Sequence, residues 1–313
     1  MTWADRIGRR IKLRDLHLLH AVIQSGSMTK AAGALAVSVP VVSKAIADLE
    51  RAVGVRLLDR NPQGVEPTIY GRALLGRSLA AFDELRQGVR DIEFLADPTA
   101  GEVRVGSTIP ISASFVTAVI DRLSRRNPRI TFNVVATQTE TLHLELSARN
   151  VDLLIARKFG PVTDELLNFE ALYDDPYVVA AGVQNPWARR RRVELADLVN
   201  ETWVLPPPNS LVGSFAVEAF RASGLDLPRS TVVTFPFEVR NSLLATGRFL
   251  TILTNSLLRF PTRHPSIKML PVHLPISSGP IGVFTLKTRL LSPVAQLFID
   301  CAREVAKPLA RAR

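Results

Sequence analysis

Motifs that would indicate an enzyme or a membrane protein are missing from this 313-residue sequence. It contains no G-x-S-x-G, H-E-x-x-H, G-x-G-x-x-G or G-x-x-x-x-G-K motif, and its five histidines are scattered. We therefore expect no catalytic residues, no cofactor and no metal. Its longest apolar stretches, such as Tyr177 to Val183, fall far short of the ~18 residues that a membrane-spanning helix needs. We therefore expect no membrane partner.

Cysteine is almost absent as well. The single Cys301 cannot form a disulfide within the chain, which fits a reducing compartment, and it falls in an amphipathic final helix where we expect it to be core. The N-terminus is charged from Asp5 onward and shows no apolar segment of a secretory signal. Together these features predict a cytoplasmic protein.

Positive charge is concentrated near the N-terminus. The chain has 39 Lys and Arg against 29 Asp and Glu, a formal net charge of +10. Residues 1–77 hold 12 basic and 6 acidic side chains, so the first quarter supplies +6 of that charge. A length of 313 residues favours two or three domains. One of them is a small basic domain with a surface suited to an anionic partner.

Helical spacing from Leu13 to Glu50 predicts three short helices. The first ends near Gly26, and Ser27 and Ser38 are suitable N-caps for the second and third. The connection between the second and third helices, Val37-Ser38, is short, which is typical of a helix-turn-helix. The expected inner stripe of the first helix is Leu16, Leu19, His20 and Ile23.

The third helix has two different faces. Val42, Ile46 and Leu49 recur at helical spacing and predict the buried face. The opposite face carries small and basic residues that can enter a DNA groove, namely Pro40, Ser43, Lys44 and Ala47.

A hairpin and a long helix follow. The turn Asn61-Pro62-Gln63-Gly64 separates two apolar runs, which predicts a wing. Beyond Thr68, a possible helix cap, six apolar residues recur at heptad-like spacing and suggest packing against a partner helix: Leu75, Phe82, Leu85, Val89, Ile92 and Ala96. The same seam could instead be the buried stripe of an intrachain helix. The segment 97–101 reads as a linker.

The remainder alternates strands with helices, which predicts an α/β region built on a largely parallel sheet. Expected strands are 102–106, 130–136, 151–156, 177–182, 203–205, 231–235 and 249–253, and expected helices include 115–126 and 141–149. More than 200 residues leave room for two lobes.

The stretch from Gly26 to Leu75 resembles, almost end to end, the DNA-binding domain of LysR-type transcriptional regulators. The matching positions are Ala31, Ala32, Ser38, Pro40, Ser43, Leu49, Glu50, Gly54, Val55, Leu57, Arg60, Thr68 and Gly71. The resemblance implies a winged helix-turn-helix (1–70), a dimerisation linker helix (71–101) and an effector-binding domain (102–313). That domain would be two-lobed, like type 2 periplasmic binding proteins, with lobe I at about 102–173 and 267–313 and lobe II at about 174–266.

The resemblance also implies the partners: double-stranded DNA, a small-molecule effector, a second or further copy of the chain as homodimer or homotetramer, and RNA polymerase. The expected DNA-binding residues are Ser27, Thr29, Ser38, Val39, Pro40, Ser43, Lys44, Arg60 and Gln63. Where this sequence has Val39, the family commonly has glutamine, which can bind an adenine edge bidentately. Valine offers only apolar contact, so the operator sequence should differ.

Effector-binding residues are expected where strands end and helices begin, because free backbone N–H groups there face the crevice. They are Ser107, Thr108, Ile109, Thr137 and Thr139 from lobe I, and Pro207, Asn209 and Phe237 from lobe II. Proline and aromatic walls with hydroxyl donors suit a small acid, a sugar or an aromatic effector. The stretch Ser242–Phe260 is similar to a branch that includes regulators of sugar-binding protein genes.

Several alternative interpretations stay open from sequence. The hydroxyls of Ser27, Ser38, Ser107, Thr108 and Thr139 could serve only as helix caps. Arg189 to Arg192 is read as a solvated loop rather than a nucleic-acid site. His17 and His20 are read as packing residues, and the adjacent acids Asp174 and Asp175 as solvated. A solute-binding protein or an enzyme that uses the two-lobed region is the alternative function.

Overall fold

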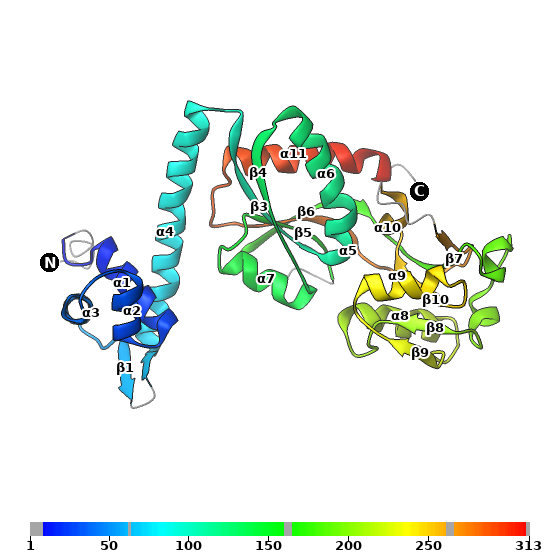
Figure 1. The fold of residues 1–313 in the computed structure, drawn as a ribbon, viewed down its shortest axis with the longest axis horizontal. Helices are drawn as coiled ribbons and strands as arrows, with labels where there is room; N and C mark the ends of the chain where they lie inside the picture. The colour runs from blue at the N-terminus through cyan, green and yellow to red at the C-terminus, as the bar shows by residue number, and fades with distance from the viewer. Residues whose placement is uncertain (1–8, 62–63, 160–164, 261–265, 311–313) are drawn as a thin grey trace. The chain divides into compact units, whose positions relative to one another are not determined.

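The computed structural model describes residues 9–61, 64–159, 165–260 and 266–310. The chain forms two compact units, Met1–Gln87 and Gly88–Arg313, and the boundary falls inside a long helix, α4 (Ile69–Ala96) (Figure 1). Of the described helices, none taken singly is long and apolar enough to cross a membrane, although the bent pair α2 and α3 passes that test together.

The first unit contains the expected three helices and the wing. These are α1 (Leu13–Ser25), α2 (Met28–Ala34) and α3 (Val39–Val53), followed by the antiparallel strands β1 (Leu58–Asn61) and β2 (Gly64–Pro67) and by the first part of α4. The core of this unit combines apolar residues of all three helices with Leu57 and Leu58. The buried stripe of α1 is Leu16, Leu18, Leu19 and Val22. Ile23 is partly buried and packs against this core, as predicted. The prediction of His20 was wrong, since His20 is only partly buried and Leu18 takes the buried position.

Lobe I of the second unit is a five-stranded sheet of order β4-β3-β5-β12-β6. Its strands are β3 (Ala100–Thr108), β4 (Arg129–Thr137), β5 (Leu153–Arg157), β6 (Leu167–Asp174) and β12 (Pro280–Leu286). Alternate strand residues point to opposite faces. Val105 and Ile155 pack in a core with α6 (Thr117–Arg126) and α11 (Pro293–Ala310), whereas Leu154 packs with α7 (Thr139–Ser147) on the other face.

Lobe II is built in the same way, from a sheet of order β11-β7-β10-β8-β9. Its strands are β7 (Tyr177–Gly182), β8 (Trp203–Leu205), β9 (Ser230–Val233), β10 (Leu250–Thr254) and β11 (Ile267–Met269). The helix α8 (Leu211–Ala222) covers one face, where its Phe220 packs against Trp203 of β8. The helices α9 (Phe237–Ala245) and α10 (Ser256–Arg259) cover the other.

Two expectations about this unit need correction. The sheets are mixed rather than largely parallel, because β12 and β6, and likewise β7 and β11, pair antiparallel with their neighbours. The return to lobe I also comes later than residue 267, since β11 pairs with β7 and Leu270 and Leu274 lie in the lobe II core. Both errors involve β6, β11 and β12, which the alternating pattern did not reveal.

Expectations about single side chains were confirmed in some cases and wrong in one. Cys301 is buried in the core of lobe I, as predicted. The side chains of Arg189 to Arg192 are exposed, as a solvated run requires. The ring of His17 packs edge-on against that of Phe82, with centroids 6.0 Å apart. Asp175, however, is only 2% exposed, so the prediction of a solvated side chain was wrong for this residue.

Candidate functional site

Helix α3 presents a free face to solvent. Its back is buried through Val42, Ala45, Ile46 and Leu49. Its front is exposed at Ser38, Val39, Pro40 and Lys44 and half-buried at Ser43. Because the apolar side is fully used in the core, the front is held in place without contributing to packing. Such a surface is free to contact another macromolecule.

The helix starts in this unit form different caps. Ser27 is the N-cap of α2, and its hydroxyl accepts a hydrogen bond from the Lys30 amide at 3.4 Å. Ser38 is the N-cap of α3 in backbone conformation, but its hydroxyl makes no capping bond. Thr29, in the first turn of α2, is exposed. The Ser38 hydroxyl therefore lies at the exposed end of α3, available for an external acceptor.

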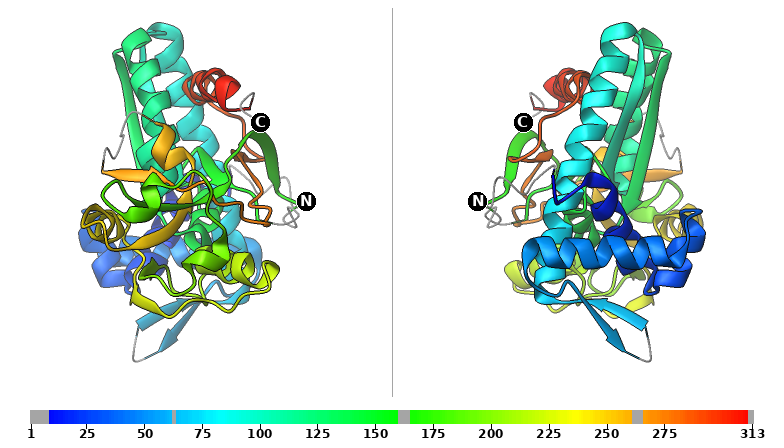
Figure 2. Two further views of the ribbon diagram at one scale, coloured as in Figure 1. Left: turned by 90° about the vertical axis from the view of Figure 1, so that its right-hand side faces the viewer. Right: turned by 90° about the vertical axis from the view of Figure 1, so that its left-hand side faces the viewer.

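Hydrogen bonds from backbone amides fix the wing to the helices. Glu50 Oε1 of α3 accepts from the amides of Leu57 at 2.8 Å and Leu58 at 3.3 Å, where the wing begins. The amide of Val65 donates to the carbonyl of Gly26, at the end of α1, at 2.9 Å. In Figure 2 the hairpin projects beyond the helices of its unit. Arg60 is exposed on β1, and Gln63 lies outside the described residues.

Gly71 shows why a glycine is needed at the start of α4. A Cβ at this position would stand 2.0 Å from the carbonyl oxygen of Leu57. The hydroxyl of Thr68 accepts from the Gly71 amide at 3.1 Å and donates to the carbonyl of Arg56 at 2.8 Å. The wing and α4 are therefore in close backbone contact.

The second unit contains a cavity of about 70 Å³ between its lobes. Lobe I lines it with Thr108, Pro110, Ile111, Thr139, Arg157 and Phe159. Lobe II lines it with Tyr177, Val212, Arg240, Ile252, Leu253, Thr254 and Leu257. Rings also meet across the lobes, since Phe215 of lobe II lies 5.6 Å from Phe159 of lobe I between centroids. Within lobe II, Phe215 lies 4.9 Å from Tyr177. The cavity is thus lined by residues of both lobes.

Two of the expected effector residues, Thr108 and Thr139, line this cavity. The other six do not line it. Ser107 is buried, and its hydroxyl donates to the carbonyl of Ile155 at 2.8 Å. Thr137 is hydrogen-bonded to Thr141 at 2.8 Å. Ile109 and Asn209 are exposed, Pro207 accepts from Ser210, and Phe237 belongs to the lobe II core.

A buried ion pair joins the segments between the lobes. Arg157, at the end of β5, donates to the carbonyls of Ser278 at 3.0 Å and Gly279 at 2.9 Å, and its Nη2 lies 3.4 Å from Asp175. Asp175 accepts at 2.8 Å from both the amide and the hydroxyl of Ser256. Burial raises the pKa of Asp175, although Arg157 and Ser256 act in the opposite direction.

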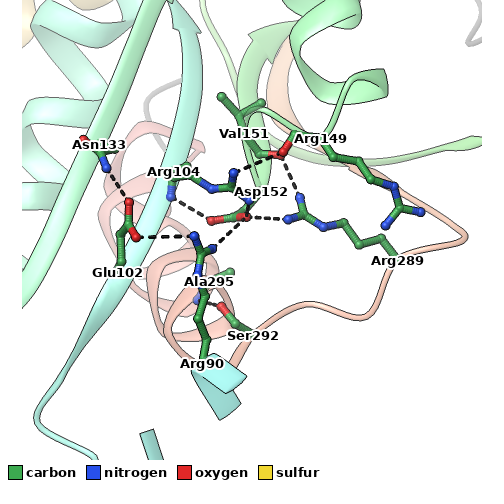
Figure 3. A network of polar contacts seen from close by, with 10 residues as sticks. All are labelled: Arg90, Glu102, Arg104, Asn133, Arg149, Val151, Asp152, Arg289, Ser292 and Ala295. Atoms are coloured by element: carbon green, nitrogen blue, oxygen red, sulfur yellow. Dashed lines mark hydrogen bonds and ion pairs between the residues drawn. The ribbon is translucent and has the colours of Figure 1, made fainter. Parts of the chain in front are cut away.

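A second buried network surrounds Asp152, beside the end of α4 (Figure 3). Its carboxylate lies 2.7 Å from both Arg104 Nη2 and Arg289 Nη2 and 3.8 Å from Arg90 Nη1 of α4. Burial alone would raise the pKa of Asp152, but the hydrogen bonds and charges of Arg104 and Arg289 outweigh it and lower the pKa. Arg90 also pairs with Glu102 at 3.4 Å, which ties this end of α4 to lobe I.

Sequence analysis missed the charged residues of both networks and the arginine that lines the cavity from lobe II. Asp152 and Arg289 are 137 positions apart and Arg157 and Ser278 are 121 apart, so no local spacing indicates these contacts. The detectable signal was modest: Asp152 and Arg157 are charged residues that border an otherwise apolar run.

Comparison with known proteins matches both units. The family model of the LysR substrate binding domain matches residues 96–307, and that of the lysR family of bacterial regulatory helix-turn-helix proteins matches 13–72. The HTH-type transcriptional regulator GbpR of Azospirillum brasilense is 28% identical over 295 residues, which cover 94% of this chain and 86% of that protein.

Solved structures share the fold. A full-length OxyR variant from Pseudomonas aeruginosa superposes with a TM-score of 0.68 at 19% identity, covering 97% of this chain and 99% of that one. Full-length CbnR in complex with its target DNA superposes with a TM-score of 0.54 at 20% identity, covering 95% and 100%.

A helix-turn-helix head, a long helix and a two-lobed α/β domain with a cavity between its lobes define a ligand-responsive DNA-binding protein. The chain belongs to the LysR-type family of transcriptional regulators. It is therefore an effector-responsive, DNA-binding regulator of transcription, a class whose members are not enzymes.

Proposed function

We propose that the exposed front of α3 enters the major groove of the operator. The observation that carries this proposal is that Val39, Pro40 and Lys44 are exposed while the opposite side of the same helix is fully buried. Lys44 contacts a phosphate, and Ser38 and Ser43 supply hydroxyls to phosphates or base edges. Val39 provides an apolar contact, such as with a thymine methyl group.

Residues outside α3 complete the proposed DNA contact. Ser27 and Thr29 lie at the start of α2, where free amides and hydroxyls can bind a phosphate. Arg60 of the wing reaches the backbone or the minor groove beside the α3 site, and Gln63, which lies outside the described residues, is assigned the same role. These contacts position the head, and the α3 residues determine sequence preference.

We further propose that α4 pairs with its counterpart in a second copy of the chain. Leu85, Val89, Ile92 and Leu95 are 52%, 57%, 68% and 77% exposed and recur along one side of the helix. Such a row of apolar side chains is costly to leave in water and suits helix pairing. A homodimer, or a homotetramer built from two dimers, would carry paired heads in the cytoplasm and could contact RNA polymerase.

The proposed sensing step uses the cavity between the lobes. An effector there contacts both lobes, so it stabilises one lobe arrangement relative to others. The arrangement then changes the placement of the paired heads through α4, which alters their affinity for the operator.

A mobility shift with the DNA upstream of the gene, at several salt concentrations, tests the DNA contact. Lys44→Ala should lower affinity and reduce the slope of log K against log salt by roughly 0.9 per head, or about 1.8 for a dimer. Arg51→Ala is the matched control, because Arg51 is exposed on the same helix but is already paired with Asp48 at 2.7 Å. Its slope should equal that of the wild type.

Two results would contradict the proposal. One is a wild-type protein that forms no salt-sensitive, sequence-preferring complex with any upstream DNA. The other is a Lys44→Ala slope identical to those of the wild type and Arg51→Ala, which would remove Lys44 from the phosphate contacts.

A further inference from the structure

Two buried arginines line the cavity, and Arg240 differs from Arg157 because it has no ion-pair partner among the described residues. It lies on α9, is only 5% exposed and lines the cavity from lobe II. Its Nη1 donates a hydrogen bond to the carbonyl of Ile252 at 3.3 Å, and the guanidinium carbon is 5.8 Å from the centre of the Phe237 ring. Its Nε is buried and has no hydrogen-bond partner among the described residues.

Within the described part of the chain, no carboxylate forms an ion pair with Arg240. Glu238 acts on it electrostatically, but this side chain is exposed and forms no salt bridge with the guanidinium. The other two arginines that are buried in the described part of this unit are paired, Arg157 with Asp175 and Arg289 with Asp152. A buried charge without a counter-ion is strongly unfavourable. Among the described residues, Arg240 is therefore a buried cation without a carboxylate partner, and an anionic ligand in the cavity would supply one.

A second polar atom of the cavity wall also lacks a partner. Thr254 Oγ1, at the end of β10, is buried and makes no hydrogen bond to any described residue. Thr108 and Thr139 add hydroxyl groups from lobe I, whereas Ile252, Leu257 and most of the remaining wall are apolar. A fitting ligand thus carries one negative charge and at least one further polar group on a short carbon chain.

The size of the cavity separates the candidate ligand classes. Because one water-sized group needs roughly 10–15 Å³ of cavity volume, the 70 Å³ available hold about five to seven non-hydrogen atoms. A hexose or an aromatic acid is larger than this. A carboxylate of about three carbons fits.

We propose that the effector is a short aliphatic carboxylate with a polar substituent, of the 2-hydroxy or 2-oxo acid class, and that Arg240 is its counter-ion. This inference rests on the proposed sensing role of the cavity. The carboxylate accepts hydrogen bonds from the free guanidinium edge, and its substituent binds Thr254. Charge-assisted pairing of this kind is among the strongest hydrogen bonds in proteins.

The test compares the full-length wild type with Arg240→Met and Arg248→Met. Arg248 is the matched control, since it is exposed in the same lobe and its guanidinium carbon also lies 5.8 Å from the centre of a phenylalanine ring. Lactate, pyruvate and propionate are titrated by calorimetry and thermal shift, with propionamide as the uncharged analogue and sodium chloride at equal ionic strength.

Lactate or pyruvate should bind the wild type and Arg248→Met and raise their melting temperatures by mass action. Propionate should bind more weakly, and propionamide should not bind. Arg240→Met should bind the acids at least about 30-fold more weakly, because it removes one member of a buried charge pair. Without ligand, Arg240→Met should melt no lower than the wild type, since a buried unpaired cation has been removed.

Three outcomes would overturn the inference. They are equal acid binding by Arg240→Met and the wild type, no saturable binding of any of the three acids to the wild type, and a ligand-free Arg240→Met that melts clearly below both other proteins. The mobility shift is run on all three proteins in parallel. Retained salt-sensitive DNA binding together with any of these outcomes refutes the carboxylate site alone, whereas absent DNA binding by the wild type refutes the proposed function.

Discussion

Replacing Asp152 by asparagine should destabilise the effector-binding domain more than any exposed charge substitution. Asparagine has nearly the same shape and keeps an oxygen that can accept from the Arg104 amide, which now donates to Asp152 at 2.8 Å. What it removes is the negative charge. The fully buried guanidinium of Arg289, which also donates to the carbonyl of Val151, then loses the carboxylate that it pairs with at 2.7 Å.

The expected magnitude follows from the burial of the partners. The side chains of Asp152 and Arg289 are 1% and 0% exposed, so water cannot compensate the lost charge. Breaking a buried pair from one side costs about 3–5 kcal/mol in the free energy of unfolding. Glu170→Gln is the control, because Glu170 binds Arg303 at the same 2.7 Å but both side chains are more than 40% exposed. Exposed pairs contribute about 0–1 kcal/mol.

Urea unfolding followed by tryptophan fluorescence measures both variants, and hydrogen exchange at the amides of Arg104 and Asp152 reports the local effect. These amides bond across β3 and the start of β5, with the Asp152 amide 2.7 Å from the Arg104 carbonyl. The pKa of Asp152 is lowered from 3.8 in the folded chain. Its stabilisation is therefore present above about pH 3.8 and is lost as the pH falls through the lowered pKa.

An equal, small loss for Asp152→Asn and Glu170→Gln would refute the reasoning, because burial would then not determine the cost. A difference between the wild type and Asp152→Asn that grows as the pH falls below 3.8 would refute the assigned ionisation state.

Two further predictions concern the first unit and the long helix. Ile92→Lys places a charge in the middle of the exposed apolar row of α4, so it should shift the protein toward monomer in analytical ultracentrifugation. It should also weaken DNA binding, because a monomer carries only one DNA-binding head. Arg77→Ala, also on α4 and exposed, should change neither property, and an unchanged mass of Ile92→Lys would remove the row from the dimer interface. Gly71→Ala should destabilise the helix-turn-helix unit by at least about 1–3 kcal/mol, because its Cβ would be 2.0 Å from the Leu57 carbonyl oxygen. Gly76→Ala, with open space around its Cβ, should be neutral or stabilising by up to about 1 kcal/mol. A protease-susceptibility assay of the helix-turn-helix unit compares the two variants, and equal stability would contradict the close approach at Gly71.

Local patterns were sufficient to predict the first unit. Helical spacing assigned Val42, Ile46 and Leu49 to the buried face of α3, and the cap at Ser27 and the turn at Gly26 fell where the residue types indicated. These signals act over a few residues, so a sequence displays them directly. The one rotated assignment, His20 in place of Leu18, arose because two leucine-rich registers overlap on α1.

Strand pairing in the second unit could not be predicted in the same way. β12 joins β5 and β6 from more than 100 residues further along the chain, and its apolar run carries no mark of its partners. Thr108 and Thr139, which were expected at strand ends, do line the cavity. Arg240 was missed, because nothing in its neighbours on α9 indicates that this arginine is buried without a carboxylate.

The position of Arg157 links ligand binding to the geometry between the lobes. This residue lines the cavity, and the same guanidinium holds Asp175 and the carbonyls of Ser278 and Gly279, which belong to the two segments that cross between the lobes. A bound anion near Arg240 would also lie in the field of Arg157 and compete with Asp175 for its charge. Ligand binding would then alter the contacts that fix the crossing segments, and the lobe arrangement would respond to the effector without a separate relay.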